Sequence, residues 1–271
     1  MSRLQRDEAA GPTGDGAETD PLTEVSESET TGDEFTFDDV TVVMGTYNEE
    51  AAIATVLEDI ERVTDWKANV VCVDGSDDGT PEVAREHGVR VIEQEPQGYG
   101  VAVREAVLAA DRPVVVTTDC DDTYPMEALP EFLAAINDGA DVVSGDRITP
   151  GAGAMPTLNR QGNRAFALLA SLLMGRRVHD TTTGMRAYRR EVVQDITWTE
   201  NTGLSAELLI RPLMRGYEVD ERPIDYDERK GETKLDPFSG GAAIARLSVT
   251  RTARAGSPVR LAPTHTSGPR R

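Results

Sequence analysis

Short runs of β-branched residues alternate with amphipathic segments over residues 40–150, and this alternation most restricts how the chain can fold. The runs predict strands buried on both faces, at 40–44, 70–73, 89–92, 114–117 and 142–143. The segments between them predict helices at 50–63, 81–87, 99–110 and 126–137. A repeated strand–helix order is typical of a mostly parallel sheet with helices on both faces. The sequence therefore predicts an α/β, Rossmann-like fold.

Helix and strand signals continue beyond residue 150 with a looser pattern. Helices are predicted at 160–175 and 203–215, and a strand at 218–224. Earlier in the chain, Thr80 precedes Pro81 and Glu82, which predicts a helix start capped by the Thr80 hydroxyl.

Charge divides the chain into three parts. Residues 1–38 are acidic and rich in Ser, Thr and Gly, which predicts a disordered segment. Residues 39–237 form the predicted folded domain, and residues 238–271 are expected to be a short helix and a basic flexible tail. The 48 acidic and 28 basic residues give a net charge of −20, which argues against a nucleic-acid partner. Lysine occurs only at 67, 230 and 234, and an acidic, lysine-poor chain suggests a salt-adapted (halophilic) cytoplasm.

Two features bear on location. Cys72 and Cys120 are too few for a disulfide framework, so buried free thiols in a reducing compartment are expected. The longest apolar run, 165–175, is shorter than the roughly 20 residues that span a bilayer, so we expect a cytoplasmic protein, soluble or peripheral. The run precedes Arg176 and Arg177, and it could rest with segment 242–254 on an anionic lipid surface. A core helix followed by a solvated tail is an equal alternative.

Carboxylates follow the fourth predicted strand. Ligands of open parallel sheets bind at the carboxyl ends of the strands, where Asp119 and Asp121 are expected. Residues two apart in an extended segment point the same way, so both carboxylates could bind one cation. Hard oxygen ligands suit Mg²⁺ or Mn²⁺. The alternative is a solvated acidic turn.

Other strand ends carry groups suited to a nucleotide. Tyr47 and Asn48 could hold a base, and Asp74 could accept a hydrogen bond from it, although Asn48 and Glu49 also suit a helix cap. Gly98 and Gly100 permit close approach of a ligand to the backbone. Cations that could bind phosphates, or pair with surface carboxylates, stand at Arg147, Arg160, Arg186, Arg229 and Lys234.

Several ordered blocks resemble a known family. Val42 to Glu49, Val73 to Thr80 and Asp119-Cys120-Asp121 are similar to the successive signatures of family 2 glycosyltransferases. The later blocks resemble dolichyl-phosphate mannose synthase-like enzymes. The block from Asp180 to Arg186 is similar to their Asp-x-x-Ser/Thr-Gly-Phe-Arg stretch. Their acceptor-phosphate segment is similar to Arg222-Pro223-Ile224 followed by the block from Arg229 to Leu235. The resemblance covers roughly residues 40–236. The chain departs from the family pattern at Gly45-Thr46 and at Val73.

The resemblance implies a GT-A fold and inverting transfer of a hexose from a GDP- or UDP-linked sugar to polyprenyl (dolichyl) phosphate, for glycan or glycoprotein assembly. It places Mg²⁺ or Mn²⁺ on Asp119 and Asp121. The implied contacts with the nucleotide sugar are Thr46, Tyr47, Glu49, Asp74, Gly98, Arg147 and Arg160. The implied contacts with the acceptor phosphate are Arg186, Arg229 and Lys234, with Arg229 counted as catalytic.

The residues alone leave two other functions open. A soluble glycosyltransferase acting on a sugar hydroxyl would need a carboxylate base, for which Glu207 and Asp180 are the candidates. A non-catalytic nucleotide- or phosphate-binding module would use the aspartates as an acidic pocket. The sequence argues against a dinucleotide dehydrogenase, because no Gly-x-Gly-x-x-Gly opens a helix after the first strand.

Overall fold

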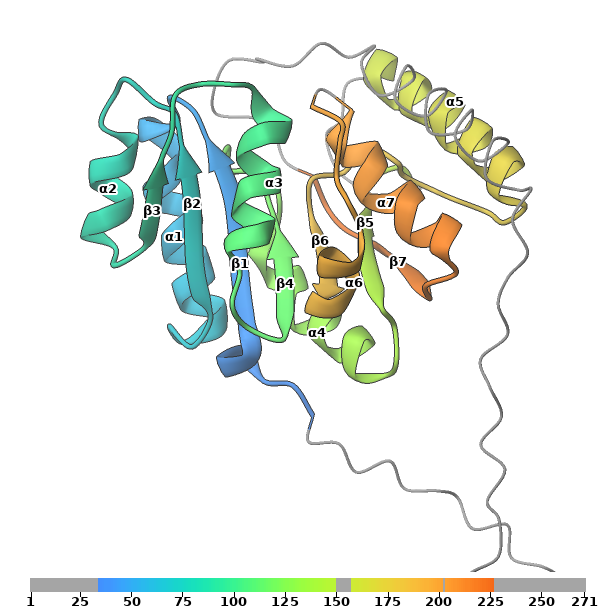
Figure 1. Ribbon diagram of the computed structural model, residues 1–271, viewed down its shortest axis with the longest axis horizontal. Helices are drawn as coiled ribbons and strands as arrows, with labels where there is room; N and C mark the ends of the chain where they lie inside the picture. The colour runs from blue at the N-terminus through green and yellow to red at the C-terminus, as the bar shows by residue number, and fades with distance from the viewer. Residues whose placement is uncertain (1–33, 150–156, 202, 227–271) are drawn as a thin grey trace, which may run out of the picture. The chain divides into compact units, whose positions relative to one another are not determined.

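A computed structural model describes residues 34–149, 157–201 and 203–226 of the chain (Figure 1). Within these residues, seven strands form one sheet in the order β3-β2-β1-β4-β6-β5-β7. Neighbouring strands pair in parallel, except that β6 runs antiparallel to both β4 and β5. The strands are β1 (Val40–Thr46), β2 (Asn69–Asp74), β3 (Arg90–Glu93), β4 (Val114–Thr117), β5 (Val142–Asp146), β6 (Arg186–Arg189) and β7 (Val219–Pro223). The predicted mostly parallel sheet is confirmed.

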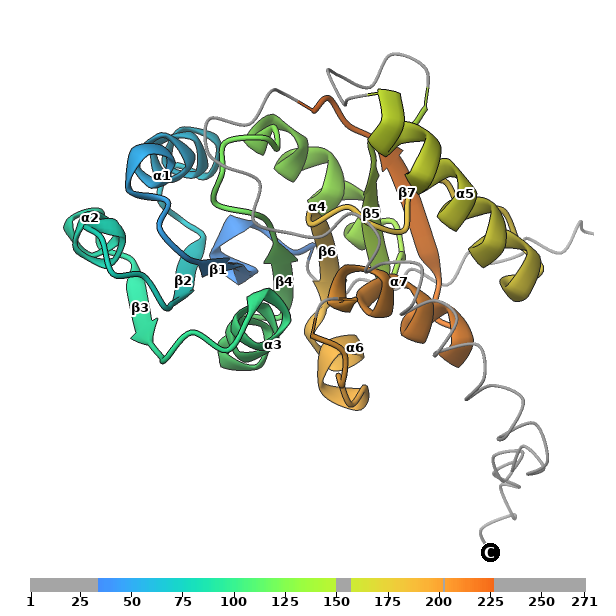
Figure 2. The same ribbon diagram turned by 90° about the horizontal axis from the view of Figure 1, so that it is seen from above.

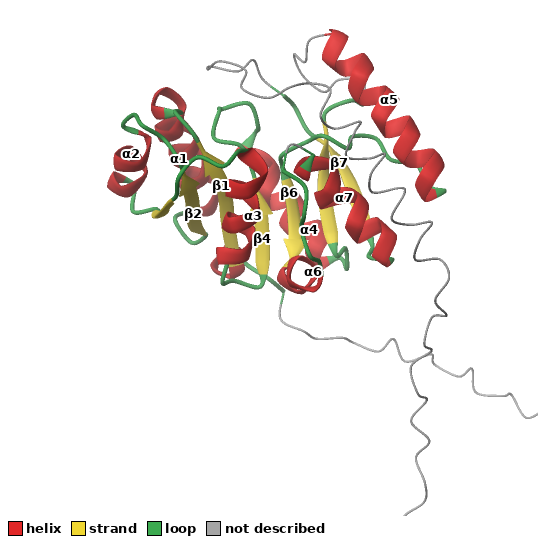
Figure 3. Cartoon of the chain, turned by 45° about the horizontal axis from the view of Figure 1, so that its top comes forward, coloured by secondary structure: helices red, strands yellow, loops and turns green. Residues whose placement is uncertain are grey.

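Helices cover both faces of this sheet. The α-helices are α1 (Glu50–Thr64), α2 (Thr80–Glu86), α3 (Tyr99–Ala109), α4 (Leu129–Asn137), α5 (Thr157–Met174), α6 (Arg190–Asp195) and α7 (Leu204–Arg215), and two 3-10 turns are η1 (Phe37–Asp39) and η2 (Met126–Ala128). In Figure 2, α1 and α4 lie on one face, and α3, α6 and α7 lie on the other. The view coloured by secondary structure shows the strands between the two helical layers (Figure 3). In Figures 1 and 2, α5 lies beyond the β7 edge.

The apolar strands supply two separate cores. Val42 and Met44 of β1 pack with Ile53 of α1 and Phe132 of α4 on one face. Val43, between them in sequence, packs with the α3 and α7 side chains on the other face. Successive residues of a strand point to opposite faces, so an uninterrupted apolar run can fill both cores. Cys72 and Cys120 are buried free thiols, as expected.

Two local predictions differ from the structure, and two elements have no counterpart in the sequence prediction. The predicted helix 126–137 is split into η2 and α4, with Pro130 in the first turn of α4, where its missing N–H costs no hydrogen bond. Gly79, not Thr80, is the N-cap of α2, and the Thr80 hydroxyl instead accepts from the Glu49 backbone N–H at 2.9 Å. Strand β6 and helix α6 were not predicted.

Parts of the predicted domain organisation lie outside the described residues. These are residues 1–33 of the acidic segment, residues 150–156, 202 and 227–237 of the predicted folded domain, and the whole of the predicted tail, 238–271. Residues 34–38 of the acidic segment are described, and the last two of them form η1 together with Asp39. Among the described helices, none combines the length and the apolar character needed to cross a bilayer.

Candidate active site

A cavity of about 280 Å³ opens where β1, β2, β3 and β4 end. Its walls include six of the residues predicted from the sequence: Thr46, Tyr47, Glu49, Gly98, Asp119 and Asp121. The remaining lining residues are Gly45, Gly75, Gln94, Pro96, Gln97, Tyr99, Ala102 and Cys120. The carboxyl ends of adjacent parallel strands meet at one edge of the sheet, which brings these distant segments together.

Asp119 is held between two elements. The Tyr99 hydroxyl, at the start of α3, donates to Asp119 Oδ1 at 2.8 Å. On another side, a Cβ added to Gly184 would lie 2.6 Å from Asp119 Oδ2, so any larger residue there would have to displace this carboxylate. Burial and then the charge of Asp119 raise the pKa of Tyr99 well above its usual value, which keeps the phenol protonated as a donor.

Asp121 lies two residues further along the same loop. Its side chain is buried, and its Oδ1 accepts from the Thr123 hydroxyl at 2.6 Å and the Thr123 backbone N–H at 3.3 Å. The described residues contain no group of three or more His, Cys, Asp or Glu side chains placed to hold a metal ion. Two carboxylates on one cavity wall nevertheless fit Mg²⁺ or Mn²⁺, because such ions commonly take one or two carboxylates and complete their shell with water and phosphate oxygens.

Asp74 supports the cavity from behind its wall. It is 2% exposed, and its Oδ1 accepts from the Thr46 hydroxyl at 2.6 Å and the Ser76 hydroxyl at 2.7 Å. Oδ2 accepts from the Ser76 N–H at 2.9 Å. Asp74 thus joins the ends of β1 and β2, and the cavity face at this point is formed by Thr46 and Gly75.

The turn that carries Gly98 is held by Asn201. Gly98 has a φ of +104°, which favours glycine. Asn201, from the segment before α7, accepts from the Gly100 N–H at 3.0 Å and donates to the Gln97 carbonyl at 2.9 Å. These bonds fix the start of α3 and therefore the position of Tyr99.

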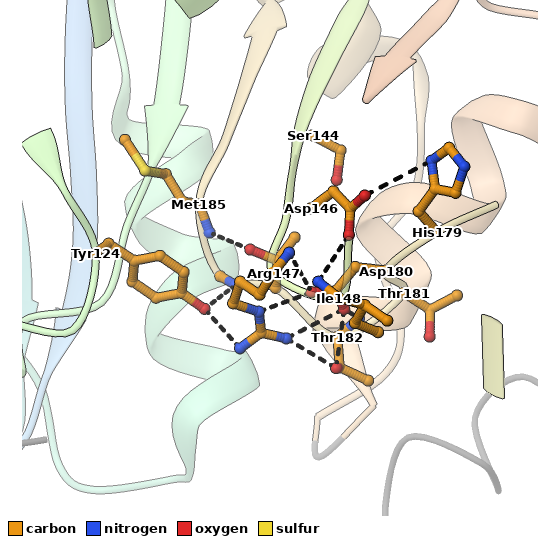
Figure 4. Close-up of polar contacts among 12 residues, drawn as sticks. Tyr124, Ser144, Asp146, Arg147, Ile148, His179, Asp180, Thr181, Thr182 and Met185 are labelled. Atoms are coloured by element: carbon orange, nitrogen blue, oxygen red, sulfur yellow. Dashed lines mark hydrogen bonds and ion pairs between the residues drawn. The ribbon is translucent and has the colours of Figure 1, made fainter. Parts of the chain in front are cut away.

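A buried polar cluster centres on Arg147, directly after β5 (Figure 4). Arg147 Nε donates to Asp180 Oδ2 at 2.7 Å, and Nη2 donates to Asp180 Oδ1 at 3.1 Å and to the Thr182 hydroxyl at 2.9 Å. Nη1 donates to the Tyr124 hydroxyl at 3.1 Å. The guanidinium also lies 5.1 Å from the ring centroid of Tyr226. Arg147 is thus oriented by a two-pronged ion pair and an aromatic face.

Burial and charge act in opposite directions on this pair. Burial alone would raise the pKa of Asp180, but the Arg147 guanidinium and its hydrogen bonds hold that pKa below the usual value. For Arg147, burial would lower the pKa, and the Asp180 charge instead raises it. Both groups therefore stay ionised.

The same cluster contacts the loop that holds Asp119. The Tyr124 hydroxyl, which receives a hydrogen bond from Arg147, also accepts from the Gly184 N–H at 2.7 Å. The Gly184 carbonyl accepts from the Thr117 hydroxyl of β4 at 2.7 Å. Gly184 is therefore held at both backbone groups while it packs against Asp119.

The expected contact of Arg186 with the acceptor phosphate does not fit this structure. Arg186 begins β6 and has no exposed surface. Its Nε donates to the Ser144 hydroxyl at 3.0 Å and its Nη2 to the Thr181 carbonyl at 3.2 Å. Because the side chain is enclosed between β5 and the preceding loop, a phosphate in the cavity could not reach it.

The candidate bases also have structural partners. Glu207 is fully buried in α7, where its two oxygens accept from the Thr199 and Glu200 N–H groups and it pairs with Arg211. A carboxylate so engaged, outside the cavity, does not fit the predicted role of catalytic base. Asp180 is bound to Arg147, and its lowered pKa makes it a weak base.

Among the described residues, neither Arg147 nor Arg160 lines the cavity. Arg160 is half-buried in α5, and Arg229 and Lys234 lie outside the described residues. The structure also adds residues that sequence reasoning missed. Gln94, immediately after β3, could have been found by the strand-end rule, whereas the roles of Tyr99 and Gly184 depend on tertiary contacts.

Comparisons with known proteins agree with this arrangement. The sequence pattern of Glycosyl transferase family 2 matches residues 41–197. The dolichyl-phosphate hexose transferase of Haloferax volcanii is 76% identical over 216 residues, which cover 80% of this chain and 95% of that protein. The undecaprenyl-phosphate mannosyltransferase of Micrococcus luteus is 28% identical over 228 residues, which cover 78% of this chain and 93% of that protein.

A solved structure supports the fold. Glucosyl-3-phosphoglycerate synthase from Mycobacterium tuberculosis, in complex with Mn²⁺ and UDP-glucose, superposes with a TM-score of 0.61 at 22% identity, covering 81% of this chain and 79% of that one. This similarity confirms the expected GT-A fold. The family pattern spans more than half of the chain, and the Haloferax protein is similar over nearly its whole length. The chain therefore belongs to glycosyl transferase family 2.

Proposed function

We propose that this chain is an inverting glycosyltransferase that moves a hexose from a GDP- or UDP-linked sugar to a polyprenyl (dolichyl) phosphate, in the assembly of glycans or glycoproteins. One observation carries the proposal: Asp119 and Asp121 stand on the wall of a cavity where β1 to β4 end. The name of the Haloferax relative, 76% identical to this chain, supports the class of acceptor.

The cavity offers a suitable place for the nucleotide. The Tyr47 side chain is 45% exposed at the cavity wall, where its ring can stack on a base. Thr46 and Glu49 supply polar groups, and Asp74 holds the ends of β1 and β2 together behind them. Gly98 lets the diphosphate or sugar approach the backbone at the start of α3.

Asp119 and Asp121 are the residues that would hold Mg²⁺ or Mn²⁺. When bound, such an ion neutralises negative charge that develops on a departing nucleoside diphosphate. The carboxylates fit this role because they are hard oxygen donors on one wall, and Tyr99 and Thr123 orient them.

The reaction exchanges one bond for another at the sugar C1. An ionised phosphate oxygen of the acceptor attacks C1 from the face opposite the diphosphate. The new C1–O bond forms as the old one breaks, and the electron pair leaves with the nucleoside diphosphate, so the anomeric configuration inverts. The nucleophile carries no proton to be removed, so no strong base is needed. The internal engagement of Glu207 and Asp180 favours this acceptor over a sugar hydroxyl.

The cations predicted from the sequence would bind the phosphates. We assign Arg147 and Arg160 to phosphates of the donor or acceptor, and Arg229 and Lys234 to the acceptor phosphate. Asp180 and Tyr124 orient the Arg147 guanidinium. Four of its five N–H groups are donated to Asp180, Thr182 and Tyr124, so the one left on Nη1 would donate to a single phosphate oxygen while the fixed positive charge attracts the phosphate.

The acceptor lipid would be met at a membrane surface. Along α5, Leu168 is 62% exposed and Leu172 is 74% exposed, one turn apart on the same side. Arg176 and Arg177 follow the helix and are also exposed. An apolar stripe beside cations suits an anionic bilayer, so we propose peripheral binding at its cytoplasmic face. The acidic, lysine-poor composition supports a salt-adapted cytoplasm.

The full chain can be tested with vesicles that contain dolichyl phosphate and with a panel of radiolabelled GDP- and UDP-sugars. Label is expected in the organic-extractable lipid, dependent on Mg²⁺ or Mn²⁺ and abolished by EDTA. Asp119→Asn and Asp121→Asn should each reduce transfer by about 100-fold or more. Asp122→Asn is the matched control, because Asp122 has a φ of +58° that asparagine tolerates and does not line the cavity.

Other outcomes would identify the alternatives. Label in a water-soluble sugar product would show transfer to a hydroxyl group. Binding of nucleotide without transfer to any acceptor would indicate a non-catalytic module. Full activity in both Asp119→Asn and Asp121→Asn would refute the metal-binding assignment.

A further inference from the structure

Tyr99 contacts the carboxylate that the proposed function assigns to the divalent cation. Its hydroxyl lies 2.8 Å from Asp119 Oδ1 and is the donor, since an ionised carboxylate can only accept. Tyr99 does not act on a substrate in the proposed chemistry, and the family resemblance described above gives it no role. Its contact therefore needs an explanation of its own.

The position of this hydroxyl is fixed by several parts of the fold. Gly98 and Gly100 flank Tyr99, and Asn201 binds the backbone on both sides of it, at Gly100 and Gln97. A Cβ on Gly100 would overlap the Asn201 backbone at 2.0 Å, so the two segments are in direct contact. The phenol is thus placed by backbone packing, not by a mobile loop tip.

Asp119 is equally restricted on its other side. Gly184 lies against the carboxylate, with room for no Cβ, and its N–H and carbonyl are bound to Tyr124 and Thr117. The carboxylate therefore cannot rotate freely away from the Tyr99 hydroxyl.

This arrangement affects how Asp119 can bind a cation. A cation that takes both oxygens of the carboxylate must share Oδ1 with the Tyr99 hydroxyl, which occupies one of its two lone pairs, whereas a cation that takes one oxygen can bind Oδ2 alone. Ca²⁺ accepts bidentate carboxylates in a large, flexible shell, while Mg²⁺ requires a small octahedral one with single-oxygen contacts. Groups that hydrogen-bond to a metal ligand commonly change metal affinity by about 10- to 100-fold.

We infer that Tyr99 is a positioning residue that sets cation selectivity, because its hydrogen bond competes with a cation for Oδ1, disfavours two-oxygen coordination by Asp119 and so favours Mg²⁺ and Mn²⁺ over Ca²⁺. This inference rests on the proposed function, since it takes Asp119 to be a cation ligand. It adds that discrimination between cations is encoded outside the carboxylate pair, at the first residue of α3.

The test measures binding of the metals themselves to the full chain. Free Mn²⁺ is followed by electron paramagnetic resonance in the presence of UDP or GDP, and Mg²⁺ and Ca²⁺ are added as competitors. The wild-type chain, Tyr99→Phe and Asp119→Asn are compared. The matched control is Tyr188→Phe, which removes another buried phenol hydrogen bond, to the Leu208 carbonyl at 3.2 Å, away from the cavity.

The wild-type chain and Tyr188→Phe are expected to bind Mn²⁺ alike and to release it to Ca²⁺ only at a large excess. Tyr99→Phe should bind Mn²⁺ about 10-fold more weakly, with the ratio of Ca²⁺ to Mn²⁺ affinity shifted towards Ca²⁺. An equal reduction for every cation would overturn the selectivity claim.

The outcomes distinguish the role of Tyr99 from the proposed function. If Asp119→Asn abolishes Mn²⁺ binding while Tyr99→Phe keeps the wild-type affinities, the role of Tyr99 is wrong and the proposed function stands. If the wild-type chain binds no Mn²⁺, or Asp119→Asn binds it normally, both fail. Equal affinity of the wild-type chain for Ca²⁺ and Mn²⁺ would overturn the inference even if Tyr99→Phe failed to fold.

Discussion

Arg147 and Asp180 form a two-pronged ion pair, with Nε 2.7 Å from one carboxylate oxygen and Nη2 3.1 Å from the other. The pair joins the end of β5 to the loop before β6, and both side chains are almost fully buried. A buried ion pair contributes little net stability in itself, but removing one partner leaves an uncompensated charge. Substitution of one partner alone is therefore expected to destabilise the folded domain.

Asp180→Asn is expected to lower the free energy of unfolding by about 3–5 kcal/mol, because Arg147 would remain buried without its counter-charge. Urea unfolding at pH 7 measures this change. Asp195→Asn is the matched control, since Asp195 pairs with Arg215 at the surface and its removal should cost less than about 1 kcal/mol. Equal effects of the two substitutions would show that the buried pair is not structurally critical.

The pH dependence of stability should identify the same carboxylate. Asp180 has a lower pKa in the folded state than in the unfolded chain, so its contribution is present above the usual value of 3.8 and is lost as the pH falls below it. The difference in unfolding free energy between the wild-type chain and Asp180→Asn should be constant from pH 7 to 5. Below the usual pKa it should shrink by about 1.4 kcal/mol per pH unit. A constant difference down to pH 2.5 would contradict the assignment.

Gly184→Ala should disturb Asp119 without touching it chemically. The added Cβ would lie 2.6 Å from Asp119 Oδ2, and the backbone of Gly184 is held by Tyr124 and Thr117, so the carboxylate must move. We expect Mn²⁺ affinity and sugar transfer to fall by about 10-fold or more. In Gly162→Ala, the control within α5, the new Cβ has open space and should stabilise the helix by about 0.5–1 kcal/mol. Wild-type Mn²⁺ binding by Gly184→Ala would show that the carboxylate is not confined there.

The exposed leucines of α5 should contribute to binding of anionic vesicles. The double substitution of Leu168→Gln and Leu172→Gln removes apolar side chains that are 62% and 74% exposed, so vesicle co-sedimentation should decrease while the fold is retained. Leu108→Gln is the control, because Leu108 is 60% exposed on α3, away from this stripe. If the double variant and Leu108→Gln both bind vesicles as well as the wild-type chain does at low and high salt, α5 is not the membrane contact.

The elements between residues 40 and 146 were predictable because their signals are local. Continuous apolar runs predicted the strands, and periodic apolar residues predicted the helices between them. Strand β6 carries no such signal, since Ala187 and Tyr188 are flanked by arginines. It is a strand because β4 and β5 supply hydrogen-bonding partners on both of its sides, and no local pattern reports that.

For this protein, the sequence by itself determined the strand–helix order and therefore which loops meet at the carboxyl edge of the sheet, including those of Thr46, Asp119 and Asp121. Only the tertiary structure decided which partner each charged side chain takes. Arg147 pairs with Asp180, Arg186 donates to the Ser144 hydroxyl, and Asp119 accepts from Tyr99. Periodicity and turn signals arise from neighbouring residues, and the sequence shows them directly. A hydrogen-bond partner depends on distances of a few ångströms between segments far apart in the chain, and those distances are set only when both cores have packed.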